Sequence, residues 1–416
     1  MPSKSRFFAN SPEFLDRKYS PYVTPDVTLS ELYAAVPRHL FRKSTTWGVY
    51  YAMRDATLVF LMYQLGCRLD TWLEWLSESL HVSPALGNVI RWVSWSAYWP
   101  LQGLSFAGLW TLAHEAGHGT LSDFSWVNHM IGFFAHTFLF VPYFAFRATH
   151  STHHKKAASI EGDENYVPRT RSQFNLPPAD AAGIRDYHAA FEDSPLYCLI
   201  EILVMQLAGL PAYLIINVRG SHKYPLGTNH FSPFSPLFKP RDRFTVLVSD
   251  VGLALMAFLC YTFITRNGLT AFIRLYFVPY LWVNCWILTV TYVQHTDPTV
   301  PHYRKGEWTF LRGALSTVDR PALGWMGRFF LKNLGHDHVT HHLFSSVPFY
   351  NQPQVTKLIK PVLKQHYNYD STNLMWALYR SFTECRFIED EGDIVFFKDS
   401  AGNSTRLLCT EISMDT

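Results

Sequence analysis

The sequence predicts an all-α integral membrane protein with about four transmembrane helices in two hairpins, interfacial helices, and a cytosolic cap that carries clustered histidines. Three observations favour this fold class. Hydrophobic residues make up 48% of the 416 residues and charged residues only 17%, whereas about 25% of residues are charged in typical soluble domains. Long apolar stretches alternate with polar loops, without repeats or heptads. The 19 histidines are mostly clustered in or beside the polar parts.

The same composition excludes several classes of protein. Low charge with high hydrophobicity excludes a disordered chain. A formal net charge of +3 excludes a protein that binds nucleic acid through bulk charge, so no nucleic acid partner is expected. The six cysteines are scattered without a Cys-x-x-Cys pair. They are therefore expected to be small buried side chains rather than a disulfide framework or a zinc ribbon.

Residues 1–45 are predicted to be a cytosolic N-terminal arm. The stretch 1–30 is polar and has no apolar core of signal-peptide length, so membrane character must come from internal segments. Thr28 or Ser30 is expected to cap a short helix that runs through Leu40.

Residues 46–345 are predicted to form the membrane domain. The clearest spans are 244–265 and 271–293, which a turn at Asn267-Gly268 joins into a hairpin. Each is close to the ~20 apolar residues that a helix needs to cross a bilayer. The other candidates are a span that begins near Ala56, the stretch 89–113, the short stretch 129–146 with Pro142 inside it, and 196–218. Polar residues and a proline interrupt 196–218, so it fits an interfacial or re-entrant helix as well as a span.

The polar segments are predicted to face the cytosol. The loop 147–193 is rich in lysine and arginine, which favours the cytosolic side. Because the last hairpin returns the chain to the side it left, residues 294–416 are expected there too, with 346–416 as a C-terminal region. Both termini are then cytosolic. The sequon at Asn403 would stay unmodified, and Glu411–Thr416 shows no retrieval signal.

Three short histidine clusters carry the candidate chemistry. They are His114-Glu115-Ala116-Gly117-His118, His150-Ser151-Thr152-His153-His154 and His338-Val339-Thr340-His341-His342. Residues four apart on a helix share a face, with Cβ atoms roughly 5–6 Å apart, so each cluster can direct several imidazoles to one metal centre. Eight histidines exceed what one tetrahedral zinc ion requires. The pattern therefore predicts room for two metal ions.

The residue types leave the identity of the metal open. Imidazole suits zinc, copper, iron and nickel. A two-metal site suits oxygen activation, because iron changes oxidation state and zinc does not. An alternative of another class is an intramembrane zinc metalloprotease, with His114 and His118 as ligands and Glu115 as general base. It leaves the other two clusters without a role. A non-catalytic metal-binding membrane protein is the remaining alternative.

At these clusters the sequence resembles the membrane-bound fatty acid desaturase family. Within it, the chain is similar to the plant and fungal Δ12 oleate desaturase branch, which includes acetylenase, hydroxylase and conjugase relatives. The resemblance covers roughly residues 25–395 and includes the three histidine boxes, 114–118, 150–154 and 338–342, in order. It continues in the strings Asp163–Arg169, Tyr292–Thr296, Leu311–Arg320 and His341–Ser345.

The resemblance implies an oxidoreductase that uses O2 to introduce a cis double bond into an acyl chain, at Δ12 from oleoyl to linoleoyl. It implies two iron ions and a ninth ligand after the last membrane helix. The implied ligands are His114, His118, His150, His153, His154, His295, His338, His341 and His342. Glu115, Asp163 and Asp337 are candidate carboxylates that orient ligand imidazoles. Three further histidines are expected to be structural: His129, His302 and His336.

The resemblance also implies the partners and the location. The acyl chain is carried on phospholipid or coenzyme A at the endoplasmic reticulum membrane, and the aromatic-rich helices would form its tunnel. The sequence lacks the His-Pro-Gly-Gly haem signature of a fused cytochrome b5 domain. A separate cytochrome b5 with its reductase is therefore the expected electron donor. Lys155-Lys156 would dock an acidic donor, or be only a solvated basic face near anionic lipid.

Departures from the branch leave the exact reaction open. Box one has Ala116 and Gly119 where the branch usually has cysteine and a further histidine, and Gly335-His336-Asp337 departs before box three. Relatives with a few changes near the metals act as acetylenases, hydroxylases or conjugases, and these activities are the alternatives. A wider space beside the metals at Ala116 would admit a non-standard or already unsaturated chain.

Overall fold

The computed structural model describes residues 6–192 and 194–409. Within these residues the regular secondary structure is almost entirely helical, and the one sheet is an antiparallel pair of β1 (His302–Tyr303) and β2 (Ile394–Val395). The predicted all-α class is confirmed. The tail Glu411–Thr416, for which the sequence predicts no retrieval signal, lies outside the described residues.

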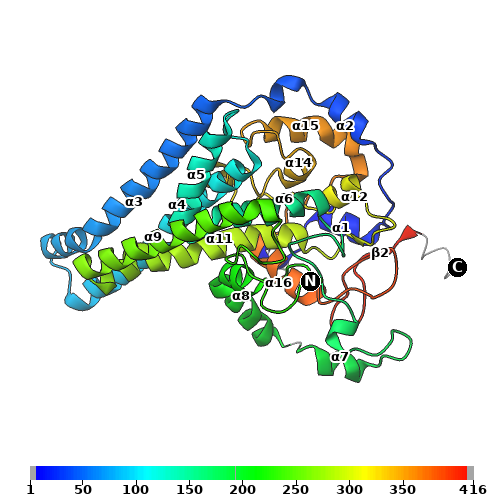
Figure 1. The fold of residues 1–416 in the computed structure, drawn as a ribbon. Helices are drawn as coiled ribbons and strands as arrows, with labels where there is room; N and C mark the ends of the chain where they lie inside the picture. Colours follow the sequence, from blue (N-terminus) through cyan, green and yellow to red (C-terminus); the bar gives the residue numbers. More distant parts are fainter. Residues whose placement is uncertain (1–5, 193, 410–416) are drawn as a thin grey trace.

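Long helices form two hairpins that lie side by side (Figure 1). The first hairpin is α3 (Thr45–Ser79) and α4 (Pro84–His118). The second is α9 (Arg243–Asn267), followed by α10 (Leu269–Phe272), the π-helical turn η5 (Ile273–Phe277) and α11 (Val278–His295). Ser44 and Ser83 cap α3 and α4 through their hydroxyl oxygens. Gly268 ends α9 at a φ of 87°, where only glycine is free of steric cost.

Length and composition mark three helical stretches as able to cross a membrane. Two are Pro240–Asn267 and Leu269–His295, in agreement with the predicted spans 244–265 and 271–293. The third contains α8 (Pro195–Ile216), for which the sequence left two possibilities open; it is a continuous apolar helix. The pair α5 (Ser125–Phe138) and α6 (Tyr143–Lys156), bent by 108°, would be a fourth span or a re-entrant loop.

The first hairpin differs from these spans in composition. α3 and α4 each have 35 residues, or about 52 Å at 1.5 Å per residue, so the expected spans near Ala56 and at 89–113 lie inside longer helices. Neither helix is among the stretches apolar enough to span, because both mix polar and aromatic residues into the apolar sequence.

The N-terminal arm contains α1 (Pro12–Tyr19) and α2 (Leu29–Ala35). Thr28 caps α2 as predicted: its hydroxyl oxygen accepts from Glu31 N, and the Glu31 carboxylate accepts from Thr28 N. The helix ends at Ala35 rather than Leu40. Pro37 explains the difference, because a proline disfavours the α conformation of the residue before it. A 3-10 turn, η2 (Arg38–Phe41), follows.

Short helices gather at one end of the long ones and form a cap (Figure 1). They are α7 (Ile184–Ala190), α12 (Phe310–Ala314), α13 (Trp325–Phe330), α14 (His338–Leu343), α15 (Gln352–Leu363) and α16 (Leu374–Glu384), with the turns η1 (Arg6–Phe8), η3 (Ser172–Phe174), η4 (Pro240–Asp242) and η6 (Lys364–His366). A buried core that includes Trp110, Phe146 and Ile287 joins the long helices to this cap.

Candidate metal centre

Four helices bring the predicted histidines together at the base of the cap. Box one occupies the last turn of α4, which Gly119 closes in the left-handed conformation at a φ of 72°. Box two lies on the last turns of α6, and box three forms most of the short helix α14. His295 is the last residue of α11. The helical spacing predicted for all three boxes is confirmed.

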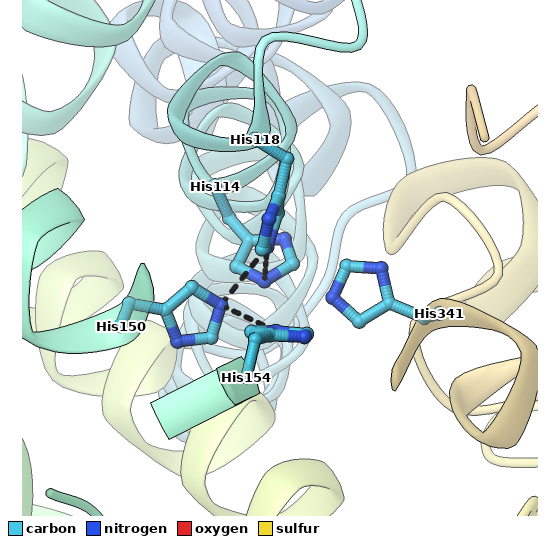
Figure 2. A group of neighbouring side chains, drawn as sticks. All are labelled: His114, His118, His150, His154 and His341. Atoms are coloured by element: carbon cyan, nitrogen blue, oxygen red, sulfur yellow. Dashed lines mark hydrogen bonds between the residues drawn. The ribbon is translucent and has the colours of Figure 1, made fainter. Parts of the chain in front are cut away.

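Five histidines form a first group (Figure 2). His114 and His118 come from α4, His150 and His154 from α6, and His341 from α14; one ring nitrogen of each lies within 4.8 Å of the others. Nε2 of His118 is 3.3 Å from Nε2 of His114 and 3.1 Å from Nε2 of His150. Nε2 of His154 is 3.0 Å from that of His150. Figure 2 shows the rings facing a common centre.

A second group lies directly beside the first. His153, His295 and His342 place one ring nitrogen each within 4.8 Å of the others. His338 joins them, because its Nε2 is 2.9 Å from Nε2 of His295. The rings of His154 and His342 stack at 4.2 Å between the two groups. The structure thus places all nine histidines singled out in the sequence in two adjacent groups.

The chemistry of these groups fits cations. A neutral imidazole has one donor and one acceptor nitrogen, so several converging Nε2 atoms cannot satisfy one another. Buried nitrogens of His341 and His342 have no hydrogen-bond partner in the described chain. Burial, and then the neighbouring histidines, hold the pKa of His338, His341 and His342 well below the ordinary value. The neutral imidazole is the form that binds metal, so the residues fit two metal ions.

The three candidate carboxylates take different positions. Asp163 Oδ1 lies 2.7 Å from His153 Nδ1, the geometry expected of a group that orients an imidazole. Glu115 Oε1 lies 3.6 Å from His114 Nδ1 and 3.8 Å from His341 Nδ1. The carboxylate of Asp337 instead lies 3.1 Å from Arg328 Nη1, and no described contact joins it to an imidazole.

Two residues beside the histidines had no role in the sequence-based prediction. Gln352 Nε2 lies 3.3 Å from His341 Nδ1. The ring of Tyr166 stacks on His295, 5.2 Å away and at 9°, and its hydroxyl is 2.6 Å from Thr291 Oγ1. Tyr166 lies in one of the strings that carry the family resemblance, but neither an amide nor a single aromatic residue forms a recognisable ligand pattern.

The other singled-out residues lie outside both groups. His129, His302 and His336 belong to neither group, as expected. Ala116 packs in an apolar cluster with Leu112, Leu121, Tyr143 and Phe349, so it does not widen the space beside the histidines. Gly119 serves as a helix cap, and a Cβ there would meet nothing within 4 Å.

An apolar cavity of about 530 Å³ reaches the two histidine groups. Five of the nine histidines line it: His114, His150, His153, His295 and His338. Its walls come mainly from α8 and α11, including Ile200, Val204 and Ile287. Asn165 and Tyr213 add a hydrogen-bonded pair at 2.6 Å near the histidines. Such a cavity suits a long apolar ligand held beside the metals.

Comparisons with known proteins identify similar sequences. The family model described as fatty acid desaturase matches residues 92–373. The chain is 39% identical over 383 residues to a Delta(12) fatty acid desaturase of Mortierella alpina, covering 91% of this chain and 92% of the relative. It is 36% identical over 373 residues to a bifunctional fatty acid conjugase/Delta(12)-oleate desaturase of Punica granatum, covering 90% and 88%. It is 34% identical over 376 residues to an oleoyl-12-hydroxylase of Ricinus communis, covering 90% of each.

Proposed function

Because the chain belongs to the fatty acid desaturase family and is an oxidoreductase, we propose that it introduces a Δ12 cis double bond into oleoyl chains, forming linoleoyl chains, with O2 as co-substrate. The observation that carries this proposal is the placement of two adjacent histidine groups against one apolar cavity. A metal pair beside an acyl chain is what oxygen-dependent dehydrogenation of an unactivated methylene pair requires.

Two iron ions are the proposed cofactors. His114, His118, His150, His154 and His341 would hold one, and His153, His295, His338 and His342 the other. Iron bound there would supply the redox chemistry of oxygen activation, which the protein's own side chains lack. Asp163 orients His153 through its hydrogen bond, and Glu115 lies against the rings of His114 and His341.

The cavity beside the histidines is proposed to hold the acyl chain. Its walls bury methylene groups and exclude water from the reacting carbons. Ile200 and Val204 line the cavity and are also half exposed on the outer face of α8. Because α8 is apolar enough to lie in a bilayer, this favours a chain that arrives from a membrane phospholipid over one carried on coenzyme A.

The protease alternative has little support in the geometry. Glu115 lies on the Nδ1 side of His114 and His341, and its other oxygen accepts from the Thr120 hydroxyl. A general base would instead face the open side of the metal, where the Nε2 atoms converge. Hydroxylase and conjugase relatives at similar identity make those outcomes the second candidate.

Electrons would come from a separate cytochrome b5 and its reductase, and the multi-pass chain would reside in the endoplasmic reticulum with its histidine boxes and termini on the cytosolic side. Lys155 and Lys156 are both exposed, so a basic face is accessible to an acidic donor. The Nζ of Lys156 lies 4.4 Å from the centre of the Trp308 ring. This face lies at the end of α6, directly after box two.

A fatty-acid profile tests the proposal. We expect yeast that makes oleate but no linoleate to gain linoleate on expression of the chain, by gas chromatography and mass spectrometry of methyl esters. His338→Ala should abolish the new product, while the exposed His188→Ala should not. Purified protein should contain two irons per chain. A hydroxylated or conjugated product would contradict Δ12 desaturation and favour the hydroxylase or conjugase activity. One zinc per chain would contradict both of these diiron activities.

A further inference from the structure

A second cavity, with a polar lining, lies between the N-terminal arm and the cap, away from the histidines. It has a volume of about 530 Å³ and shares no lining residue with the cavity beside the metal centre. Four parts of the chain far apart in sequence line it: α1 with the chain after it, Leu315, the end of α15 with η6 and the residues up to Tyr369, and Arg406. We call it the basic cleft, because four cations line it: Arg17, Lys360, Lys364 and Arg406.

The charges of the basic cleft are not balanced. Its acidic lining residues are Glu13 and Asp16. No described ion pair joins Lys360, Lys364 or Arg406 to a carboxylate. Lysines near a helix C-terminus interact favourably with the helix dipole. This explains why Lys360 and Lys364 stand at the end of α15 without carboxylate partners. Arg406 comes from another segment, so the dipole does not explain it.

Backbone carbonyls, rather than a described ion pair, hold Arg406 in place. Its guanidinium donates to two backbone carbonyls, those of Ser20 at 3.0 Å and Thr299 at 3.1 Å. Burial, and then the positive charge of Arg17, lower the pKa of Arg406 to about 10. The guanidinium groups of Arg17 and Arg406 both line the cleft, and their like charges repel each other.

Arg17 supplies a buried donor without a partner. Its Nε donates to Thr299 Oγ1 at 2.9 Å and its Nη1 to the carbonyl of Tyr369. Nη2 is buried and makes no hydrogen bond in the described chain. Its ion-pair partner, Asp297 Oδ2, is 3.8 Å away. That oxygen lies much closer to Arg320 Nη2, at 2.6 Å. A buried donor without a hydrogen-bond partner lowers the stability of the folded protein. An anion bound in the cleft would accept from Arg17 Nη2.

We propose that the basic cleft binds a phosphate-bearing ligand. Phosphate oxygens accept from guanidinium forks and from ammonium groups, and charge-assisted bonds of this kind are the strong ones. The cleft is concave and Arg17 is recessed in it, which suits a small anion better than the acidic surface of a protein. This proposal does not depend on the reaction that the metal centre performs.

Hydrogen bonds connect the basic cleft to the third histidine box. Tyr367 lines the cleft, and its hydroxyl donates to Asp319 Oδ2. Asp319 Oδ1 accepts from Val339 N at 2.7 Å, one residue after His338. A ligand that orders Tyr367 would therefore stabilise the start of α14.

Binding to the full-length protein in detergent tests the proposal. Isothermal titration with pyrophosphate gives the affinity, and flotation with phosphatidylcholine vesicles, with and without phosphatidic acid, tests a lipid source. The variant Lys360→Gln/Lys364→Gln removes two exposed cations of the cleft. We expect it to weaken binding about tenfold or more, the equivalent of about 1.4 kcal/mol. Lys357→Gln, an exposed lysine on the same helix outside the cleft, is the matched control and should bind like wild type.

The outcomes separate the two sources of phosphate. Saturable pyrophosphate binding that the double variant loses supports a soluble ligand. Binding only to phosphatidic acid vesicles, lost in the same variant, supports the cleft with a lipid headgroup as ligand. No saturable binding of either probe overturns the proposal, and so does an equal loss in Lys357→Gln. An unchanged melting temperature of the double variant excludes unfolding as the cause.

Discussion

Tyr166 has a backbone conformation that bulky residues rarely adopt. Its φ is 56°, and such outliers cost about 1–3 kcal/mol and persist where the surroundings enforce them. The enforced position puts the ring parallel to His295 and the hydroxyl on Thr291. Because Tyr166 also lines the apolar cavity, it holds a proposed metal ligand from the side on which the acyl chain would lie.

Substitution of Tyr166 should therefore affect the second histidine group more than the fold. Tyr166→Phe keeps the stacked ring and loses one hydrogen bond, a cost of about 1 kcal/mol, so it should retain two irons per chain. Tyr166→Leu loses the stack and should lower bound iron towards one per chain. Metal analysis of purified protein measures this. Equal iron in the Leu variant and wild type would contradict a positioning role.

Asp163 is the carboxylate whose removal should weaken metal binding. It accepts from backbone N–H groups of Ala158, Glu164 and Asn165 as well as lying on His153 Nδ1. Asp163→Asn should lower metal affinity about 10–100-fold, as loss of such partners typically does. Asp337→Asn is the matched control: this carboxylate is also buried but contacts Arg328. Competition with an iron chelator measures both, and an equal effect would contradict the assignment.

Residue types explain which parts of the site the sequence could predict. Histidines three or four apart share a helix face, so the spacing alone singles out the eight histidines of the three boxes. His295 stands alone in the sequence, and only the family resemblance implied it. Gln352 and Tyr166 could not, because amides and aromatic residues occur throughout the chain. Asp337 was predicted as a carboxylate that orients a ligand imidazole. The first turn of α14 points its carboxylate to Arg328 instead.

Close packing of α4 against α11 positions box one relative to His295. The two helices approach closely at Gly103, where an added Cβ would lie 2.3 Å from Trp282 Cβ and 2.8 Å from the carbonyl oxygen of Pro279. The contact with backbone leaves little room for adjustment. This pairing fixes the ends of the two helices relative to each other, and those ends carry His114, His118 and His295.

Gly103→Ala should therefore destabilise the protein although alanine favours helices. Overpacking costs about 1–3 kcal/mol, which exceeds the ~1 kcal/mol that alanine gains over glycine inside a helix. Gly87→Ala, on the same helix, is the control, since its Cβ would meet only the Ser77 side chain, with Oγ at 3.4 Å and Cβ at 3.9 Å. Melting of detergent-solubilised protein should show a lower midpoint for Gly103→Ala only. A midpoint unchanged in both would contradict close packing.

Hydropathy predicted the helices whose apolar composition alone marks them as membrane spans. The hairpin of α9 and α11 agrees with the predicted spans within a few residues, because each predicted span contains a single charged residue, Asp250 or Arg274. The stretch 129–146 was predicted as one short candidate span. It instead contains the end of α5 and the start of α6, which meet at an angle of 108°. Pro142 precedes α6 and lacks the N–H that a continuous helix requires there. Local composition does not give that angle, which packing of both helices on α4 determines.

At the scale of the whole molecule, the arm and the C-terminal region close over the end of α11. Ser11 Oγ donates to Asp370 Oδ1 at 2.7 Å. Asp370 Oδ2 accepts from Arg320 at 2.5 Å and from Arg380 at 2.6 Å. The sequence could not predict this network, because Ser11 and Asp370 lie 359 positions apart and no local pattern links them.

This buried network predicts a stability that depends on pH. Burial alone would raise the pKa of Asp370, but Arg320 and Arg380 hold it below the ordinary value. A carboxyl whose folded pKa is depressed contributes stability above its unfolded pKa of about 3.9 and loses it as the pH falls towards the folded pKa. Wild type should therefore lose stability progressively below about pH 5.

Asp370→Asn should remove that dependence and lower stability at neutral pH. It leaves Arg320 and Arg380 buried without their shared carboxylate, and breaking a buried pair costs about 3–5 kcal/mol. Asp180→Asn, at an exposed carboxylate, is the control and should melt like wild type at every pH. Melting midpoints between pH 7 and about pH 3, below the unfolded pKa of a carboxyl, measure both effects. If Asp370→Asn lost stability on acidification as steeply as wild type, other carboxyl groups would be responsible for the pH dependence of the stability. A flat profile at a lower midpoint would assign it to the Arg–Asp network that joins the two ends of the chain.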